Sequence, residues 1–343
     1  MTSQRTIARH PDTDSALDML FVVDELATLL PSHDTSVALM EAAQLRGHRV
    51  LVTSASGLGY QDGVVTARCQ DVTLRPAVLH GRRWITDREW FQLGEAYDYP
   101  LDEAQVVFMR TDPPVDAEYL RATYLLDLVD PDRTIVINSP KGLRDANEHL
   151  FALRVPELSP PTLVSADARQ IRDTVGDWGR AVLKPTDGMA GRGVLILAAG
   201  DPNLASIVDT ATDRGRVQVL VQQWVPACAH GDRRVIVLDG TPIGAVRRIA
   251  GEDEFRCNMA TGAAAVTDSV TDLDRDICAE LAPHLRAHGL VFVGIDVIGD
   301  RLTEVNVTSP TGLREIDALS GTQLAEDVVA WVEANRPARF RRG

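Results

Sequence analysis

Lysine is nearly absent from this sequence, because Lys141 and Lys184 are the only lysines beside 33 arginines in 343 residues. Cysteine is also scarce, and the four cysteines show neither a CxxC pair nor the Cys/His spacing of a zinc site. They are therefore expected to be reduced thiols of a cytoplasmic protein. A formal net charge of −14 argues against a general binder of nucleic acid or of anionic membranes.

Several other features are missing. No apolar stretch is long enough to span a bilayer, and residues 1–17 lack the apolar core of a signal peptide. We therefore expect no membrane partner, and a frayed N-terminus. No repeat of fixed period occurs, which argues against a solenoid, and the absence of GxSxG and HExxH motifs argues against the hydrolases that carry them.

The first third of the chain alternates short β-rich runs with helical ones. A helix is predicted from a cap at Ser36 to Arg46. Strand–helix–strand alternation predicts a parallel sheet that binds ligands near the carboxyl ends of its strands. The strands are predicted at 20–24, 49–54, 105–110 and 134–138.

The pattern changes after about residue 150. Residues 145–154 are interpreted as a helix with an acidic first turn, and the runs TLVS, AVLK, GVLIL and VQVLVQQW predict a mixed sheet within 162–224. The runs RRVIVL, IGAVRR, LVFVGIDVIG and RLTEVNV predict a second, mostly antiparallel sheet. Two β-rich lobes would then face each other, and WVPACAHGD (224–232) carries the proline and glycine of a hinge between them.

Lys184 ends the apolar run AVLK and is followed by Pro185 and a glycine-rich stretch. Gly188, Gly191 and Gly193 would let backbone N–H groups approach an anion closely. Lysine adds a compact positive charge where a planar guanidinium fits less well. The pattern predicts a phosphate site, and a flexible hairpin with a surface lysine is an equally favoured alternative.

Three residues with oxygen-bearing side chains occur in GIDVIGDRLTEVNVTSPTG (294–312). Asp296 lies on one predicted strand, while Glu304 and Asn306, two residues apart, share a face of the next. Such oxygen atoms can hold Mg²⁺ together with triphosphate oxygens and water. Acids on a solvated sheet face are the alternative, which Asn306 makes less favoured because an amide adds little to solubility.

Other charged side chains are placed at predicted loops. MRTDPP (109–114) leaves a strand through two prolines and puts Arg110 and Asp112 at the ligand-binding edge of the sheet. Arg256 lies in AGEDEFRCNMATGAAA (250–265), whose small and polar residues are typical of a mobile lid that closes on a carboxylate or phosphate. An ordinary turn and a solvated loop charge are the alternatives.

Together these stretches resemble the bacterial glutathione synthetases of the ATP-grasp superfamily. The motifs MRTDPPVDAEYLRATYLLD, INSPKGLRDANEHLF, LKPTDGMAG, GDRRVIVLDG and FVGIDVIGDRLTEVNVTSPTGLREI occur in family order. The resemblance implies an α/β and α+β chain with an ATP-grasp fold. A Rossmann-like N-terminal domain (18–144) would precede a central lobe (145–223) and a C-terminal lobe (224–338), and the two β-rich lobes would enclose ATP.

The resemblance also implies roles for individual residues. Two magnesium ions, with manganese as an alternative, would be held by Asp296, Glu304 and Asn306. ATP would be contacted by His149, Lys184, Asp187, Gly188, Met189, Gly191, Gly193, Gln223, Trp224, Val225 and Asp232. The substrates would meet Arg110, Asp112, Arg234, Arg256, Ser309, Pro310, Thr311 and Gly312, and catalytic roles would fall to Arg234, Arg256 and Asn258.

The implied reaction joins γ-glutamylcysteine to glycine through an acyl phosphate made from ATP, in a homo-oligomer. Three departures from the family pattern are His149 in place of a lysine, Cys257 in place of a glycine, and Ala263–Ala265 in place of a tail with glycine and arginine. An ATP-grasp ligase for another acid or amine is therefore an alternative. A non-catalytic ATP sensor is less favoured because the metal ligands are intact, and a Rossmann dehydrogenase is disfavoured because the glycine loop comes late.

Overall fold

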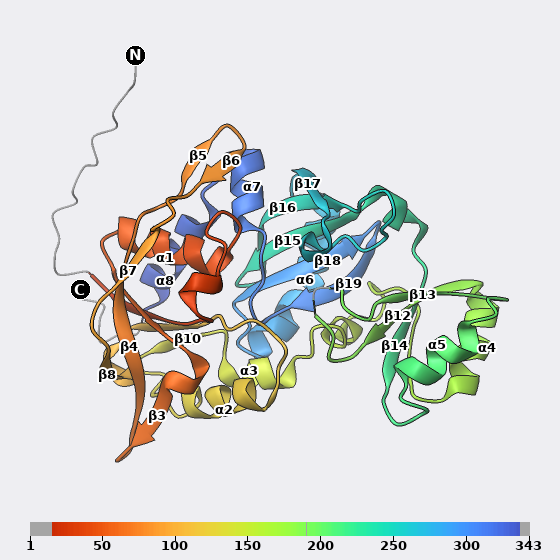
Figure 1. Ribbon diagram of the computed structural model, residues 1–343, viewed down its shortest axis with the longest axis horizontal. Helices are drawn as coiled ribbons and strands as arrows, with labels where there is room; N and C mark the ends of the chain where they lie inside the picture. The colour runs from red at the N-terminus through yellow and green to blue at the C-terminus, as the bar shows by residue number, and fades with distance from the viewer. Residues whose placement is uncertain (1–15, 190, 337–343) are drawn as a thin grey trace.

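The computed structural model describes residues 16–189 and 191–336 (Figure 1). The predicted frayed N-terminus lies almost wholly outside these residues. Three main sheets follow one another along the chain, and Figure 1 shows the C-terminal sheet between the N-terminal and the central sheet. In the part of the chain that the structure describes, no helix is long and apolar enough to cross a membrane.

The N-terminal sheet has a parallel half and an antiparallel half. The strands β10, β9, β1 and β2 are parallel neighbours, which confirms the predicted parallel sheet, whereas β4 pairs antiparallel with β2 and with β3, β7 and β8. The antiparallel half was not predicted. The strands are β1 (Asp18–Val22), β2 (Arg49–Thr53), β3 (Leu58–Gln61), β4 (Val64–Leu74), β7 (Phe91–Leu93), β8 (Tyr97–Pro100), β9 (Val106–Met109) and β10 (Ile135–Ile137), with a separate hairpin of β5 (Val78–His80) and β6 (Arg83–Ile85).

Helix α1 (Thr35–Leu45) begins after Asp34, whose carboxylate accepts a hydrogen bond from the N–H of Val37. The predicted cap at Ser36 is wrong, because Ser36 lies buried in the first turn and accepts a hydrogen bond from Arg110 Nε at 3.0 Å. Aspartate and serine cap equally well, so the sequence offered two starting points two residues apart. The other helices of this half are α2 (Ala117–Leu126) and α3 (Pro140–Asp145).

The central sheet has the order β11-β14-β12-β13, and all of its neighbouring pairs are antiparallel. The predicted mixed sheet is therefore wrong. Strands β11 and β12 run in the same direction, but β14 lies between them and runs the opposite way. The elements are β11 (Thr162–Ser165), β12 (Arg180–Pro185), β13 (Leu195–Ala198), β14 (Val219–Gln223), α4 (Ala168–Trp178) and α5 (Leu204–Ala211).

The C-terminal sheet has the order β17-β16-β15-β18-β19 and is antiparallel throughout, which confirms the second predicted sheet. The predicted hinge contains the short 3-10 helix η5 (Pro226–His230). The elements are β15 (Asp232–Leu238), β16 (Thr241–Ile249), β17 (Ala264–Thr267), β18 (Phe292–Ile298), β19 (Arg301–Asn306), α6 (Asp272–Ala287), α7 (Leu313–Ser320) and α8 (Leu324–Asn335).

The predicted helix over 145–154 is also wrong. Helix α3 ends at Asp145, and only Phe151–Arg154 form a short 3-10 helix. The side chain of Asn147 accepts hydrogen bonds from the N–H groups of His149 and Leu150, and such local bonds compete with a helix. The resulting turn brings its side chains to the C-terminal sheet.

Hydrophobic cores divide the chain differently from the sheets. Val22 of the N-terminal sheet and Val235 of the C-terminal sheet belong to one core cluster, and Phe21 and Ile236 belong to another. The two sheets therefore pack as one body. The central sheet has its own core with α4 and α5. The predicted domain boundaries after 144 and 223 stay predictions.

Candidate active site

A pocket between the central and C-terminal sheets encloses about 750 Å³, part of it open to solvent. We call it the inner pocket. Val182 and Lys184 of β12 line it, while their neighbours Ala181 and Leu183 face the central core, as the two-residue period of a strand requires. Its lining also includes His149, Gly191, Gln222, Gln223, Trp224, Val225, Asp232, Arg256, Asn258, Asp296 and Glu304.

A second pocket, the outer pocket, lies beside the loop that follows β19. Asn258 and Glu304 line both pockets, so the two pockets are adjacent. A molecule in one pocket would therefore meet a molecule in the other at these two side chains. The lining of the outer pocket also includes Asp112, Glu148, Met189, Arg234, Arg248, Asn306, Thr308, Ser309, Pro310 and Thr311.

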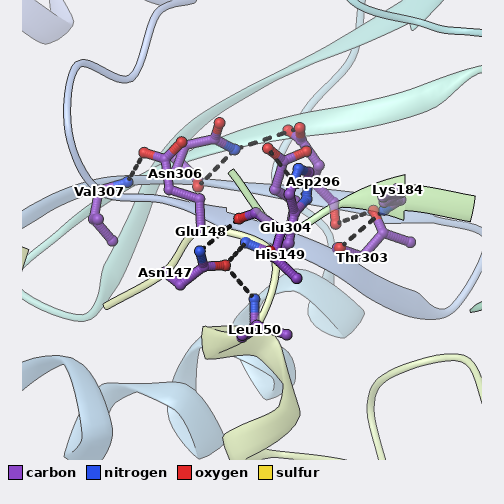
Figure 2. A network of polar contacts seen from close by, with 12 residues as sticks. Asn147, Glu148, His149, Leu150, Lys184, Asp296, Thr303, Glu304, Asn306 and Val307 are labelled. Atoms are coloured by element: carbon purple, nitrogen blue, oxygen red, sulfur yellow. Dashed lines mark hydrogen bonds and ion pairs between the residues drawn. The ribbon is translucent and has the colours of Figure 1, made fainter. Parts of the chain in front are cut away.

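Asp296, Glu304 and Asn306 lie together on the pocket face of β18 and β19 (Figure 2). Asp296 is paired in register with Glu304, and Gly294 with Asn306, while Val305 points into the core. Two carboxylates and an amide supply oxygen ligands suited to a hard cation. Across the described residues, no three His, Cys, Asp or Glu side chains are grouped to hold a metal. The third oxygen-bearing side chain of the present group is an asparagine.

Two arginines contact Asp296. Arg234 donates from Nε to Oδ1 at 2.5 Å and from Nη2 to Oδ2 at 3.0 Å, and Arg248 Nη2 lies 2.9 Å from Oδ2. Burial opposes the charge of Asp296, but the two guanidinium groups outweigh it and hold the pKa of Asp296 far below its usual range. Asn306 Nδ2 adds a fourth contact, 3.4 Å from Oδ2. A carboxylate has about two lone-pair sites on each oxygen, so Oδ1, which accepts one hydrogen bond from the described residues, keeps room for a cation. The residues present therefore fit a metal ion.

Lys184 and His149 bring nitrogen atoms to the same place. Lys184 Nζ donates to the carbonyl of Thr303 at 3.3 Å, and burial lowers the pKa of Lys184 although Glu304 and Asp296 act against it. His149 Nδ1 is buried 3.9 Å from a Glu304 oxygen and has no hydrogen-bond partner within the described protein. Burial lowers the pKa of His149, which favours the neutral ring. A buried nitrogen without a partner is costly, so this atom suits contact with a ligand.

The glycine-rich loop between β12 and β13 touches the 250–265 segment. Gly191 and Gly193 have φ angles of 75° and 71°, a region that glycine adopts without strain. Arg256 Nη1 donates to the carbonyl of Gly191 at 3.0 Å, and a Cβ atom at Gly191 would lie 2.7 Å from Oδ1 of Asn258. Glycine is thus required where the loop meets the segment, and both line the inner pocket.

Comparison with known proteins identifies the family. Residues 17–144 match the prokaryotic glutathione synthetase N-terminal domain, and residues 148–321 match the prokaryotic glutathione synthetase ATP-grasp domain. The chain belongs to the prokaryotic glutathione synthetase family. A glutathione synthetase of Thermosynechococcus vestitus is 52% identical over 316 residues, which cover 92% of this chain and 99% of the relative. One of Xanthomonas axonopodis pv. citri is 41% identical over 320 residues, covering 93% and 98%.

The fold is shared more widely than the sequence. The crystal structure of a D-cycloserine synthetase superposes with a TM-score of 0.61 at 18% identity, covering 94% of this chain and 100% of that one. This likeness shows the ATP-grasp fold, which confirms the predicted fold class. Membership of the glutathione synthetase family makes the chain an ATP-dependent ligase that forms a carbon–nitrogen bond.

The ATP contacts expected from the glutathione synthetase resemblance fall mainly in the inner pocket. His149, Lys184, Gly191, Asp232 and the three residues 223–225 line it. Met189 lines the outer pocket instead, while Asp187, Gly188 and Gly193 lie in the same loop outside the lining of both. Burial raises the pKa of Asp232 to about 6 although Arg248 lies beside it. These ATP contacts stay predictions.

The expected substrate contacts are divided between two layers. Asp112, Arg234, Ser309, Pro310 and Thr311 line the outer pocket. Arg110 lies deeper and is 3% exposed, since it donates to Ser36 and, from Nη2 at 3.0 Å, to the carbonyl of Pro310. Gly312 precedes α7, and Arg256 lines the inner pocket and pairs with Glu254. The structure thus places Arg110 beneath the loop, where it supports Pro310.

Sequence reasoning missed several residues of this cleft. Glu148 Oε1 accepts hydrogen bonds from the N–H of Val307 at 2.8 Å and of Thr308 at 3.0 Å, although burial raises the pKa of Glu148 (Figure 2). The guanidinium of Arg180 lies 4.0 Å from the ring centroid of Trp224 and covers one side of the indole. Glu148 could have been noticed as an acid between Asn147 and His149, but nothing in the sequence relates Arg180 to Trp224.

Proposed function

We propose that this chain joins γ-glutamylcysteine to glycine, with conversion of ATP to ADP and phosphate. The observation that supports the proposal is that the inner pocket and the outer pocket are adjacent and share Asn258 and Glu304. The inner pocket has a neutral hinge wall at Gln223–Val225 for the base and Lys184 for the phosphates. The outer pocket has Arg234 and the 308–311 loop for a carboxylate.

The chemistry follows from this arrangement. The substrate carboxylate attacks the γ-phosphorus of ATP to give an acyl phosphate, and the amine then displaces phosphate to form the amide. Lys184, Arg234 and Arg256 supply preorganised positive charge around the phosphoryl group, and a water-excluding 250–265 segment protects the acyl phosphate from hydrolysis. The protein itself provides no nucleophile.

A metal ion is part of the proposal. Two Mg²⁺ ions, with Mn²⁺ as an alternative, would be held by Asp296, Glu304 and Asn306, and would add positive charge beside the ATP phosphates. The register of β18 and β19 supports this assignment, because it sets the three side chains on one face.

The test is phosphate release from ATP and Mg²⁺ in the presence of γ-glutamylcysteine and glycine, beside a panel of other acids and amines. We expect turnover with the glutathione precursors and little with either substrate alone. Turnover only with another acid–amine pair would favour the alternative, an ATP-grasp ligase with other substrates. The departures from the family pattern at Cys257 and Ala263–Ala265 would then reflect those substrates. ATP binding without any turnover would favour a sensor.

We also propose that the protein works on free small molecules in the cytoplasm as a homo-oligomer. The four free cysteines support a reducing compartment. Light scattering of the purified protein measures the oligomeric state, and a monomer would contradict that part of the proposal.

A further inference from the structure

Two cysteines from distant parts of the chain meet beside the inner pocket. Cys228 lies in η5, which follows the hinge wall, and Cys257 lies in the 250–265 segment. Both line the inner pocket. The other two cysteines, Cys69 and Cys278, are buried in a core cluster that contains neither of them.

The two thiols share a neighbour. Both sulfur atoms lie near the carbonyl oxygen of Phe255, at 3.6 Å for Cys228 and 3.8 Å for Cys257. Cys257 is 5% exposed, whereas Cys228 is half-buried. An oxidant would therefore reach Cys228 first.

The surroundings divide the roles between the two sulfur atoms. The neighbouring Cys257 thiol lowers the pKa of Cys228 against the effect of burial, and the charges of Arg180 and Lys184 act in the same direction. The neighbouring Cys228 thiol and burial raise the pKa of Cys257. Because the thiolate is the reactive form, Cys228 is the nucleophile and Cys257 is the partner that resolves it.

We propose that Cys228 and Cys257 form a reversible disulfide, made by a hydroperoxide, that fastens the 250–265 segment to the hinge and closes the inner pocket. The Cys228 sulfur attacks the peroxide oxygen, which gives a sulfenic acid and releases water or alcohol. The Cys257 sulfur then displaces hydroxide, which leaves as water, and the disulfide is formed. The two thiols lose two electrons and two protons, and the peroxide is reduced.

The location of the bond explains its expected effect. Cys257 is flanked by Arg256, which donates to Gly191, and by Asn258, which lines both pockets. A disulfide at this position would keep the segment against the hinge, so a nucleotide could neither enter nor leave freely. Conversely, ATP in the inner pocket would shield both thiols from oxidation. Formation of the bond needs no turnover, so the inference does not depend on which substrates the ligase joins.

The experiment treats the reduced full-length protein with hydrogen peroxide, with and without ATP, then alkylates free thiols and maps peptides by mass spectrometry. We expect one linked peptide pair, 228 with 257, in a monomer-sized chain lighter by two hydrogens, and slower formation with ATP. The link should persist in Cys278→Ser and vanish in Cys228→Ser and Cys257→Ser. Absence of the linked pair, or a link to Cys69 or Cys278, would overturn the proposed disulfide.

A second measurement tests closure. ATP affinity of the oxidised protein should be weaker by at least about tenfold, because the open pocket becomes a minor state, and dithiothreitol should restore it. Unchanged affinity in protein that carries the link would overturn the closing role. Phosphate release by the reduced protein tests the ligase separately, so failure of the disulfide leaves the proposed reaction standing.

Discussion

Glu148 holds the loop after β19 by three hydrogen bonds to one carboxylate oxygen, two of them from Thr308, through its N–H at 3.0 Å and its hydroxyl at 2.8 Å. The third comes from the N–H of Val307. Glu148 lies in the turn after α3, far in sequence from the loop that it contacts. The contact therefore sets the position of Ser309–Thr311 in the outer pocket. We therefore expect this contact to affect the binding of the acid substrate.

Glu148→Gln should raise the KM of the acid substrate at least about tenfold and leave the KM of ATP nearly unchanged. Glutamine can keep an acceptor oxygen at the position of Oε1, but it removes the negative charge. A hydrogen bond to a charged group contributes about 1.5–3 kcal/mol against about 0.5–1.5 kcal/mol for a neutral one, so the three bonds are weakened together. Steady-state phosphate release, with each substrate varied in turn, gives the two constants. Equal increases in both would show that Glu148 supports the whole cleft instead of the loop.

Glu304→Gln should lower turnover at least about 100-fold, the usual scale for losing a supporting electrostatic group. Glu304 lines both pockets and is a proposed metal ligand, and the neutral amide of glutamine would hold a cation poorly. Glu280→Gln on the exposed face of α6 is the matched control and should keep normal turnover. Near-normal activity of Glu304→Gln over a range of Mg²⁺ concentrations would remove the metal assignment.

Lys184→Arg should weaken ATP binding at least about tenfold, since a charged hydrogen bond of about 1.5–3 kcal/mol is lost or misplaced. The buried ammonium fits between β12 and the Thr303 carbonyl, and a planar guanidinium needs more room there. The other lysine offers the control, because Lys141 is exposed and Lys141→Arg should bind ATP normally. Calorimetric titration with ATP measures the affinity of both variants. Full affinity in Lys184→Arg would contradict the argument that the site needs a compact positive charge.

The ion pair between Glu333 of α8 and Arg46, which follows α1, is expected to make the stability of the protein depend on pH. The hydrogen bond from Arg46 holds the pKa of Glu333 below its usual 4.5, and burial lowers the pKa of nearby His48. A depressed carboxylate pKa stabilises the fold above pH 4.5, and that stability is lost as pH falls through the folded pKa.

Glu333→Gln should therefore cost up to about 1 kcal/mol of unfolding free energy at pH 7, and the difference from the parent should shrink below pH 4.5. Urea unfolding across this range measures it. A difference that stayed constant down to pH 3 would show that packing, and not the ion pair, is responsible. Glu280→Gln serves again as the control and should show no such trend.

Much of the fold and of the cleft could be predicted because the information is local. Alternation along β12 already set Val182 and Lys184 on one face, and the spacing of Glu304 and Asn306 set them together on β19. The mixed central sheet was wrong because strand order depends on how distant strands pair. Two other wrong predictions concern competition between local choices. Asp34 and Ser36 were both good caps, and the side chain of Asn147 replaced helical bonds in a stretch that had a helical pattern.

The sequence by itself determined which residues point the same way along each strand, where the glycine loop lies, and which family pattern the chain follows, because these depend on neighbours a few positions apart. Only the tertiary structure decided that Glu148 supports Thr308, that two arginines share Asp296, and that Cys228 lies beside Cys257 at the carbonyl of Phe255. Those contacts join segments separated by long stretches of chain, and their partners are chosen by how the sheets pack, which no local spacing encodes.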